Sequence, residues 1–285
     1  MICYFHSTDL DGKCSAAIVK SMYPHVELIP LDYGDNYEAK IFSRNFTNET
    51  IFFVDITLDP RSLMLQLEKD GNRVIVIDHH ITAIQEIKNM GWKPEGILQD
   101  GKAGCELTWE FLYPEPMNVG VPMPIAVKYL GRYDVWDHSD PNTELFQYGM
   151  RYMDLGVDAL EWKILLSRKV STEIFISDVI KTGKIIRSWN SVKNKKIASM
   201  SAREIMFEGL RAITINGYDG SPLFESVYNE ENYDIMISYI QRKDGTWSYG
   251  FYSDKPEVHC GEIAKKYGGG GHKGASGCNL KKLLF

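Results

Sequence analysis

Acidic and imidazole side chains recur in the first eighty residues of the chain, each time after a short run of apolar, β-prone residues. The residues at these positions are His6, Asp9, Asp11, Asp55, Asp78, His79 and His80. In an open α/β sheet the carboxyl ends of the strands meet at one edge, where ligands bind. We therefore expect these side chains to converge on a single site.

Taken singly, Asp9 or Asp11 is better explained as a cap of the helix expected to begin near Gly12. If these side chains lie close together, this interpretation changes. Carboxylates that lie side by side repel one another, and the pKa of at least one of them rises unless cations neutralise the cluster. A mixed set of carboxylate and imidazole ligands favours a first-row divalent ion such as manganese over calcium, magnesium or structural zinc. The cluster offers enough ligands for two ions, with Asp55 available to bridge them. Two ions with a water molecule between them are suited to hydrolysis at phosphorus, because they stabilise both the attacking and the leaving oxygen.

Four apolar runs predict the strands that position these residues, at 1–5, 26–31, 51–54 and 73–77. Helix-compatible stretches separate them, and continuously apolar strands are typical of a parallel sheet covered by helices on both faces. The pattern turns helical over 103–135, and 158–208 is predicted to be mostly helical. The first part of the chain is therefore predicted to be an α/β unit followed by connector helices.

A second β-rich series occupies 211–216, 234–241 and 247–252, and its pattern predicts a meander with a hairpin at a Lys-Asp-Gly turn. A helix is expected from near Pro256 to Gly268. The stretch 268–277, with six glycines, is predicted to be a loop whose backbone approaches a ligand. We predict an α/β fold class with a catalytic domain at 1–200, including the connector helices, and a smaller α/β domain at 201–285.

The overall charge limits the classes of substrate that the protein is expected to bind. The chain has 32 basic and 38 acidic side chains, a net charge of −6, which excludes a globally basic surface. A long nucleic acid strand requires an extended basic groove, so no long nucleic acid partner is expected. Five cysteines without a C-x-x-C pair suit a reducing compartment, and no apolar run approaches about 18 residues. We expect a cytoplasmic protein without a membrane partner.

Three motifs stand out together: Asp9-x-Asp11-Gly12 after the first apolar run, Asp78-His79-His80 after the fourth, and Gly-Gly-Gly-Gly-His-Lys-Gly-Ala-Ser-Gly at 268–277. In this order they resemble the DHH phosphoesterase family, in its nano-RNase (oligoribonuclease) branch. The resemblance covers nearly the whole chain. It implies an N-terminal catalytic domain, an appended substrate-binding domain, and two manganese ions used to hydrolyse phosphoester or phosphoanhydride bonds.

The resemblance also implies a role for each motif residue. One ion would be held by His6, Asp9 and Asp55, and the other by Asp11, Asp55, His79 and Asp134. Asp134 lies in the stretch 131–137 (GRYDVWD), where it is preferred to Asp137. His80 would face the scissile phosphate as a hydrogen-bond donor, and Asp78 would orient a neighbouring imidazole.

Glycines 268–271 predict an anion-binding nest, to which the next two side chains add charged donors. The predicted substrate contacts are Gly269, Gly270, Gly271, His272, Lys273 and Tyr252. Tyr252 stands where many members of the family have an arginine. Its ring offers a surface for base stacking, although strand tyrosines commonly pack within the sheet.

We predict a manganese-dependent phosphodiesterase that degrades short oligoribonucleotides or related small nucleotides by attack of hydroxide. The cations near the motifs are few, Lys273, Arg242 and Lys13, which favours a nucleotide over pyrophosphate or polyphosphate. One alternative is a phosphatase or pyrophosphatase/exopolyphosphatase acting on small phosphorylated metabolites. Another is a nucleotide-binding module without turnover. The sequence leaves the oligomeric state open, a homodimer included.

Overall fold

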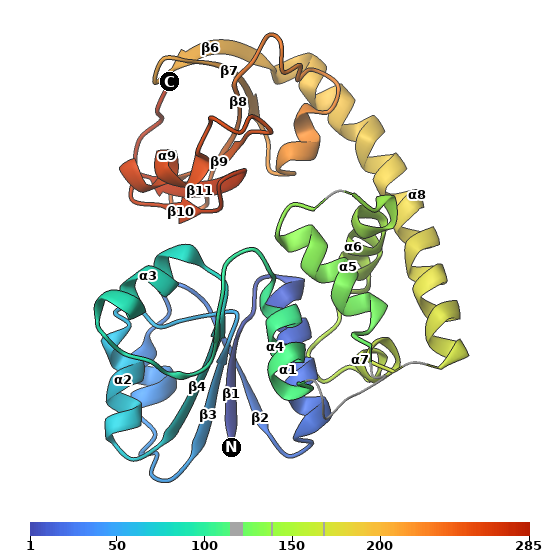
Figure 1. Cartoon of the computed structure of the whole chain (residues 1–285). Coiled ribbons are helices and arrows are strands. Elements are labelled where there is room, and N and C mark those ends of the chain that lie inside the picture. The colour runs from blue at the N-terminus through green and yellow to red at the C-terminus, as the bar shows by residue number, and fades with distance from the viewer. Residues whose placement is uncertain (115–121, 138, 168) are drawn as a thin grey trace. The chain divides into compact units, whose positions relative to one another are not determined.

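The computed structural model describes residues 1–114, 122–137, 139–167 and 169–285. They form two compact units, Met1–Lys184 and Ile185–Phe285, and the boundary between them along the chain falls within the long helix α8 (Val170–Ser201) (Figure 1). The domain boundary predicted between residues 200 and 201 lies in the same helix. Across the described ranges, no helix combines the length and the apolar character needed to cross a bilayer.

The N-terminal unit contains a five-stranded sheet in which every strand pairing is parallel, in the order β2-β1-β3-β4-β5. Its strands are β1 (Ile2–His6), β2 (Glu27–Leu31), β3 (Thr50–Val54), β4 (Arg73–Asp78) and β5 (Glu95–Leu98). The four predicted apolar runs match the first four strands. The fifth strand was not predicted, since its four residues carry no clear β pattern.

Helices cover both faces of this sheet (Figure 1). Along β1, Cys3 and Phe5 enter one apolar cluster, while Ile2 and Tyr4 enter another. The first cluster packs against α1 (Leu10–Met22), α4 (Gly104–Leu112) and α5 (Ile125–Asp134); the second packs against α2 (Ser62–Lys69) and α3 (Ile81–Asn89). Because successive strand residues point to opposite faces, continuously apolar strands are buried on both sides. The predicted α/β fold is confirmed.

The rest of the N-terminal unit is helical. A π-helical turn occupies Glu38–Phe42, and α6 (Pro141–Met153), α7 (Leu160–Leu165) and the first part of α8 follow the sheet. Residues 115–121 of the predicted helical segment 103–135, and residue 168 of the segment 158–208, lie outside the described residues. The prediction of helix up to residue 208 was wrong at its end, because the helix stops at Ser201 and a strand begins at Arg203.

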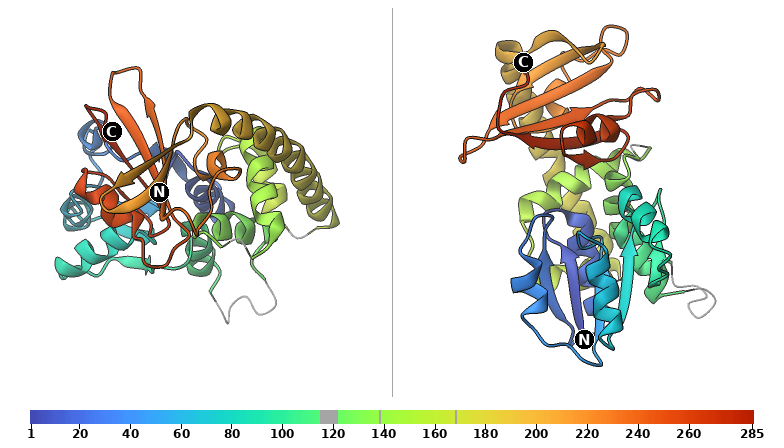
Figure 2. Two further views of the ribbon diagram at one scale, coloured as in Figure 1. Left: turned by 90° about the horizontal axis from the view of Figure 1, so that it is seen from above. Right: turned by 90° about the vertical axis from the view of Figure 1, so that its left-hand side faces the viewer.

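The C-terminal unit is drawn in the gold to red part of the colour scale in Figure 2. It contains a mixed six-stranded sheet in the order β10-β11-β9-β8-β7-β6. Its strands are β6 (Arg203–Phe207), β7 (Leu210–Asn216), β8 (Ile235–Gln241), β9 (Trp247–Tyr252), β10 (Gly270–Gly271) and β11 (Ala275–Leu280). The short helix α9 (Cys260–Lys266) shares an apolar cluster with one face, and a 3₁₀ turn, Ser221–Phe224, shares another cluster with residues of β7 and β8. The predicted α/β character of this unit is therefore also observed.

Two predictions for this sheet need correction. The hairpin between β8 and β9 is antiparallel as predicted, but β7 and β8 run parallel, so the predicted meander is wrong at that pair. The connection 217–234 is long enough for the crossover that parallel strands require. The glycine-rich stretch 268–277 is not simply a loop, because it contains β10 and the start of β11.

Candidate metal centre

The candidate site lies at the carboxyl ends of three adjacent strands, β1, β3 and β4. The register pairs Phe5 with Val54, and Val54 with Ile77, so the residues that follow are at the same edge of the sheet. These residues are His6 at the end of β1, Asp55 after β3, and Asp78, His79 and His80 at and after the end of β4. The strand-end argument thus correctly places these side chains together.

One group of ligand atoms comes from His6, Asp9 and Asp55, and all three atoms lie within 4.8 Å of one another. The Nδ1 atom of His6 is 2.7 Å from Oδ2 of Asp9 and 3.5 Å from Oδ2 of Asp55. Asp9 also caps α1, because its other oxygen, Oδ1, accepts a hydrogen bond from the Gly12 N–H at 2.9 Å. The capping role and the position in the cluster are therefore compatible, since each uses a different carboxylate oxygen.

A second group is formed by Asp11, His79 and Asp134, again with ligand atoms within 4.8 Å. The Nε2 atom of His79 is 3.3 Å from Oδ2 of Asp134 and 3.7 Å from Oδ2 of Asp11. It is also 3.2 Å from Oδ1 of Asp55. The two oxygens of Asp55 therefore face different groups, Oδ2 toward His6 and Oδ1 toward His79. Asp137, the alternative to Asp134, pairs with Arg132 instead.

The N-terminus of α4 holds Asp11 in place. The backbone N–H groups of Gly104 and Cys105 donate to Oδ2 and Oδ1 of Asp11, each at 2.7 Å. Unpaired N–H groups and the helix dipole at this end both favour a carboxylate. A Cβ atom on Gly104 would lie 2.8 Å from the Cβ of Asp55, so only glycine allows α4 to approach this closely.

Asp55 adopts a backbone conformation that is uncommon for residues other than glycine, with φ at +57°. Aspartate and asparagine tolerate this left-handed region better than most residues, and such strain is concentrated at functional sites. The side chain is 1% exposed, and neither carboxylate oxygen has a hydrogen-bond partner within the described part of the chain. Buried polar atoms without partners are rare. A divalent cation is the kind of partner that this carboxylate lacks, so the donor set fits metal ions.

Burial and neighbouring charges together raise the pKa values of several side chains in this cluster. Burial, followed by the negative charges of Asp11 and Asp9, raises the pKa of Asp55 well above its usual value. Burial lowers the pKa of His6, but the carboxylates of Asp55 and Asp9 outweigh it and raise this pKa to about 11. Burial and Asp11 also raise the pKa of Asp134. Without metal, the cluster therefore retains protons at neutral pH, and divalent ions would replace them.

Asp78 has a different environment from the other carboxylates. Its Oδ1 atom accepts hydrogen bonds from the backbone N–H groups of His79 at 2.8 Å and His80 at 3.3 Å, and lies 2.6 Å from Nδ1 of His80. Burial opposes ionisation of Asp78, but the two imidazoles prevail and lower its pKa. Burial likewise lowers the pKa of His80, but Asp78 raises it to about 9. Asp78 thus orients the imidazole of His80 rather than that of His79.

Two nearby residues were missed by the sequence argument. Asp32 follows β2, and its Oδ1 atom lies 3.2 Å from Nε2 of His6. The ring of Tyr33 has its centroid 5.7 Å from that of His6 and 6.0 Å from that of His80. The strand-end rule, applied to β2 as it was to the other strands, identifies Asp32, because Asp32 follows the last residue of that strand.

The predicted substrate contacts all lie in the C-terminal unit. The backbone N–H groups of Gly268 and Gly269 already donate to the carbonyls of Lys265 and Ala264, at 3.0 and 2.9 Å, so these two donors of the predicted nest are not exposed as expected. Packing explains the glycine at position 269, because a Cβ atom there would lie 2.1 Å from the carbonyl oxygen of Gly277. Gly270 and Gly271 form β10, and the side chain of Lys273 is exposed.

The aromatic residues of β9 alternate between the two faces of the sheet. Tyr249 is 3% exposed and belongs to the apolar cluster that includes Ile263 of α9, while Trp247 packs against the same cluster. Tyr252 is half-buried, and it packs against the cluster of Ile213 and Met236 on the opposite side. Tyr249 is therefore a core residue, and part of Tyr252 serves the packing of the sheet.

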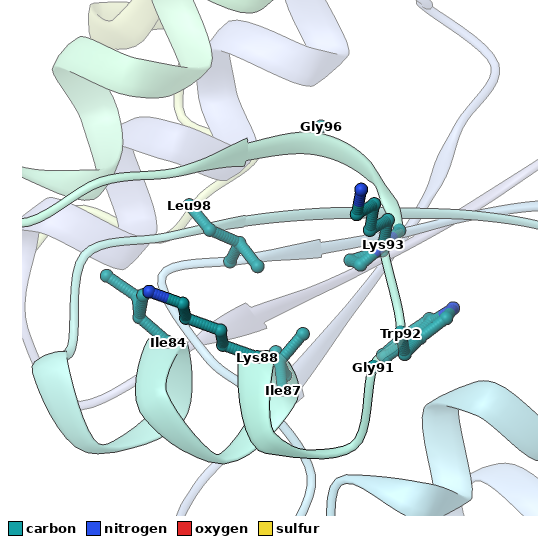
Figure 3. Close-up of a pocket in the computed structure, with 9 residues that line it drawn as sticks. Ile84, Ile87, Lys88, Gly91, Trp92, Lys93, Gly96 and Leu98 are labelled. Carbon is teal, nitrogen blue, oxygen red and sulfur yellow. The ribbon is translucent and has the colours of Figure 1, made fainter.

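A separate cavity of about 270 Å³ lies between α3 and β5 (Figure 3). Its lining is mainly apolar and includes Ile84, Ile87, Trp92, Pro94 and Leu98, with two lysine side chains beside them. It is lined by neither carboxylates nor imidazoles, so it offers no metal ligands. The chemistry-bearing residues are at the strand ends rather than in this cavity.

Comparison with known proteins shows what the chain is similar to. Residues 1–131 match the sequence profile of the DHH family, N-terminal domain. An uncharacterised protein of Acanthamoeba polyphaga mimivirus is 24% identical in an alignment of 224 residues that covers 75% of this chain and 49% of that protein. The chain therefore spans about half the length of the curated relative that it matches.

Three solved structures share the fold. The DHH domain of a member of the s1p family of ribosomal proteins aligns with a TM-score of 0.62 and 14% identity, over 98% of this chain and 82% of that one. An exopolyphosphatase-related protein from Bacteroides fragilis aligns with a TM-score of 0.53 and 15% identity, over 99% and 87%. RecJ from Thermus thermophilus, in complex with Mn²⁺, aligns with a TM-score of 0.51 and 15% identity, over 98% and 49%. At such low identity the likeness concerns the fold alone. Residues 1–131 are thus similar in sequence to the N-terminal domain of the DHH family, and the chain as a whole is similar in fold to these structures.

Proposed function

We propose that the protein is a metal-dependent phosphodiesterase that hydrolyses short oligoribonucleotides or related small nucleotides. The observation that carries the proposal is the position of Asp55 between two ligand groups. One of its oxygens is 3.5 Å from Nδ1 of His6 and the other is 3.2 Å from Nε2 of His79. Neither oxygen accepts a hydrogen bond from the described residues. A carboxylate in this position is suited to bridging two cations.

The residues that would hold the ions follow from the two groups. His6, Asp9 and Asp55 would hold one ion, and Asp11, Asp55, His79 and Asp134 would hold the other. The mixture of carboxylate oxygen and imidazole nitrogen favours manganese among the common divalent ions. When bound, two such ions lower the pKa of a water molecule and neutralise charge on a phosphate.

His80 would supply a proton or a hydrogen bond to the substrate. Its Nδ1 atom is engaged by Asp78, so the donor toward a phosphoryl or leaving-group oxygen would be Nε2. With its pKa raised to about 9, the imidazole is protonated at neutral pH in the metal-free protein. A hydrogen bond from this ring to an anionic oxygen is charge-assisted and is therefore stronger than one between neutral groups.

We further propose that the C-terminal unit binds the substrate through His272 and Lys273. In this arrangement the preceding glycines shape the β10–β11 turn, and they do not offer a row of free N–H groups. An exposed ammonium such as that of Lys273 attracts phosphate without fixing its orientation closely. Tyr252 remains a proposed contact for a base through the part of its ring that is not packed.

The substrate class is tested with the full chain and manganese. We expect a dinucleotide to be cleaved to nucleoside monophosphates, with little release of inorganic phosphate from a 3′,5′-bisphosphate nucleotide or from pyrophosphate. A preference for the last two substrates would instead indicate the phosphatase or pyrophosphatase alternative. Stoichiometric nucleotide binding with no product from any of them would indicate a binding module.

The site itself is tested with a pair of aspartates on the same stretch of chain. We expect Asp134→Asn to lower manganese-dependent cleavage of the dinucleotide by at least about 100-fold, because a ligand of the second ion is lost. Asp137→Asn is the matched control, since Asp137 pairs with Arg132 and lies outside both groups. If the two variants have equal activity, the proposed site is wrong.

A further inference from the structure

Asp32 is a carboxylate at the candidate centre to which the proposed chemistry gives no role. It immediately follows Leu31, which pairs with His6 in the parallel register of β1 and β2. The Ser7 N–H donates to the Leu31 carbonyl at 3.0 Å and holds the two strand ends together. The backbone N–H of Asp32 donates to Oδ2 of Asp35 at 2.7 Å, which fixes the turn that follows β2. Strand pairing therefore places Asp32 beside His6.

The two ring nitrogens of His6 face different surroundings. Nδ1 points to the candidate metal ligands Asp9 and Asp55, at 2.7 and 3.5 Å. Nε2 lies 3.2 Å from Oδ1 of Asp32 and 2.8 Å from the hydroxyl of Thr8. A metal-binding imidazole is neutral, and it carries its single proton on the nitrogen away from the ion. If Nδ1 is the ligand atom, Nε2 must therefore be a donor, and it needs an acceptor.

We propose that Asp32 is a positioning residue for His6. It accepts the Nε2–H hydrogen bond and thereby holds His6 in the tautomer whose Nδ1 lone pair points toward Asp9 and Asp55. The inference rests on the proposed function, because it requires an ion at this group. An ionised carboxylate can only accept, so it enforces the direction of this hydrogen bond. The hydroxyl of Thr8 can donate as well as accept and does not select a tautomer.

The carboxylate of Asp32 also matters through its charge. A carboxylate hydrogen-bonded to a metal-binding imidazole makes the ring a better ligand, and loss of such a partner commonly weakens metal binding about 10- to 100-fold. The side chain of Asp32 is 37% exposed, whereas that of His6 is 13% exposed. Replacing Asp32 is therefore expected to leave the folded core intact and to change the site locally.

Metal binding without turnover is the first readout. Mn²⁺ titrations followed by calorimetry and by electron paramagnetic resonance are compared for the wild type and for His6→Ala, which identifies the binding step that involves His6. We expect Asp32→Ala to weaken that step about 10- to 100-fold and to leave the other step unchanged. Asp32→Asn should have a smaller effect, because its amide oxygen still accepts a hydrogen bond.

The second readout is spectroscopic, because a merely structural role for Asp32 would not change it. In the ¹⁵N-labelled, zinc-loaded protein, we expect His6 to carry its proton on Nε2, with slow exchange of that proton in the wild type. Asp32→Ala should speed the exchange or populate the other tautomer. Asp35→Asn is the matched control, since it changes the same turn without contacting His6 through its own side chain.

Each of the following results would contradict the proposed role of Asp32. Equal loss of affinity in Asp35→Asn and Asp32→Asn would show that the shape of the turn matters rather than the carboxylate of Asp32, and would overturn it. An effect in Thr8→Val but not in Asp32→Ala would assign the acceptor to Thr8 instead. Unchanged affinity and tautomer in Asp32→Ala would overturn the proposal while the proposed function stands. A wild-type protein that binds no manganese would overturn both.

Discussion

Asp55 in the N-terminal unit and Asp234 in the C-terminal unit have opposite electrostatic surroundings. The carboxylate of Asp234 contacts two cations, Nη2 of Arg211 at 3.1 Å and Nζ of Lys255 at 2.7 Å, and these hydrogen bonds hold its pKa well below the usual range. Asp55 is buried beside other carboxylates, and its pKa is raised. The C-terminal unit thus neutralises this charge internally, whereas the N-terminal unit leaves Asp55 in need of an external cation.

This difference explains how the two units divide the proposed work. A buried carboxylate cluster without cations is unfavourable for folding, and such clusters persist where they serve a function. In the proposed function the cluster in the N-terminal unit would bind metal ions, and the ions would in turn attract an anionic substrate. The C-terminal unit would bind the phosphate through exposed side chains, a role that needs no buried carboxylate cluster.

The largest expected effect is that of Asp55→Asn. An amide carries no charge and cannot bridge two cations as a carboxylate does, so we expect the loss of tight binding at both ion sites. Manganese-dependent hydrolysis should fall by about 10,000-fold, since two interactions of the kind that each contribute about 10²-fold are removed together. Calorimetry with Mn²⁺ and an assay of dinucleotide cleavage measure these two quantities.

Asp234→Asn is the control for that comparison. It should leave manganese binding unchanged and lower the free energy of unfolding by about 1 kcal/mol, because partly exposed ion pairs contribute little. The metal-free Asp55→Asn protein should be at least as stable as the wild type, because a buried and repelled carboxylate is removed. The contrast between the two units fails if both variants lose stability equally and both retain manganese.

A smaller expected effect is the pH dependence of metal binding. The pKa of His6 is raised to about 11 and that of Asp55 is also raised, so the metal-free cluster holds protons that Mn²⁺ must displace. Affinity should therefore increase with pH, by roughly tenfold per pH unit for each proton released. Titration between about pH 6 and about pH 8, in buffers of different ionisation enthalpy, counts these protons. Affinity independent of pH would show that the cluster binds metal without releasing protons.

The smallest expected effect is that of Lys273→Ala in the C-terminal unit. Loss of one exposed ammonium should raise KM for a dinucleotide up to about fivefold, equivalent to about 1 kcal/mol, with manganese affinity unchanged. Lys282→Ala, which removes another exposed lysine of the same unit outside the glycine stretch, is the matched control. A fall in manganese affinity in Lys273→Ala, or an equal rise of KM in both variants, would contradict the division between the units.

Much of the N-terminal fold could be predicted because its signals are local. The four apolar runs indicate buried strands, and residues such as His6, Asp55 and Asp78 stand at their ends. The elements that were missed have weak or ambiguous local signals. β6 (REIMF) follows a 32-residue helix without a strong break, and β10 consists of two glycines that form a strand only by pairing with β11.

The sequence by itself determined which side chains stand at the strand ends, since apolar periodicity and the residue that follows each strand are local properties. Only the tertiary structure decided which of them face one another. The order of the strands places Asp55 between His6 and His79, and it brings Asp32 to the far side of His6. The amides of α4 reach Asp11 from 93 and 94 positions away along the chain. These contacts depend on strand order and helix packing, which arise from burial over the whole unit and leave no mark at any single position.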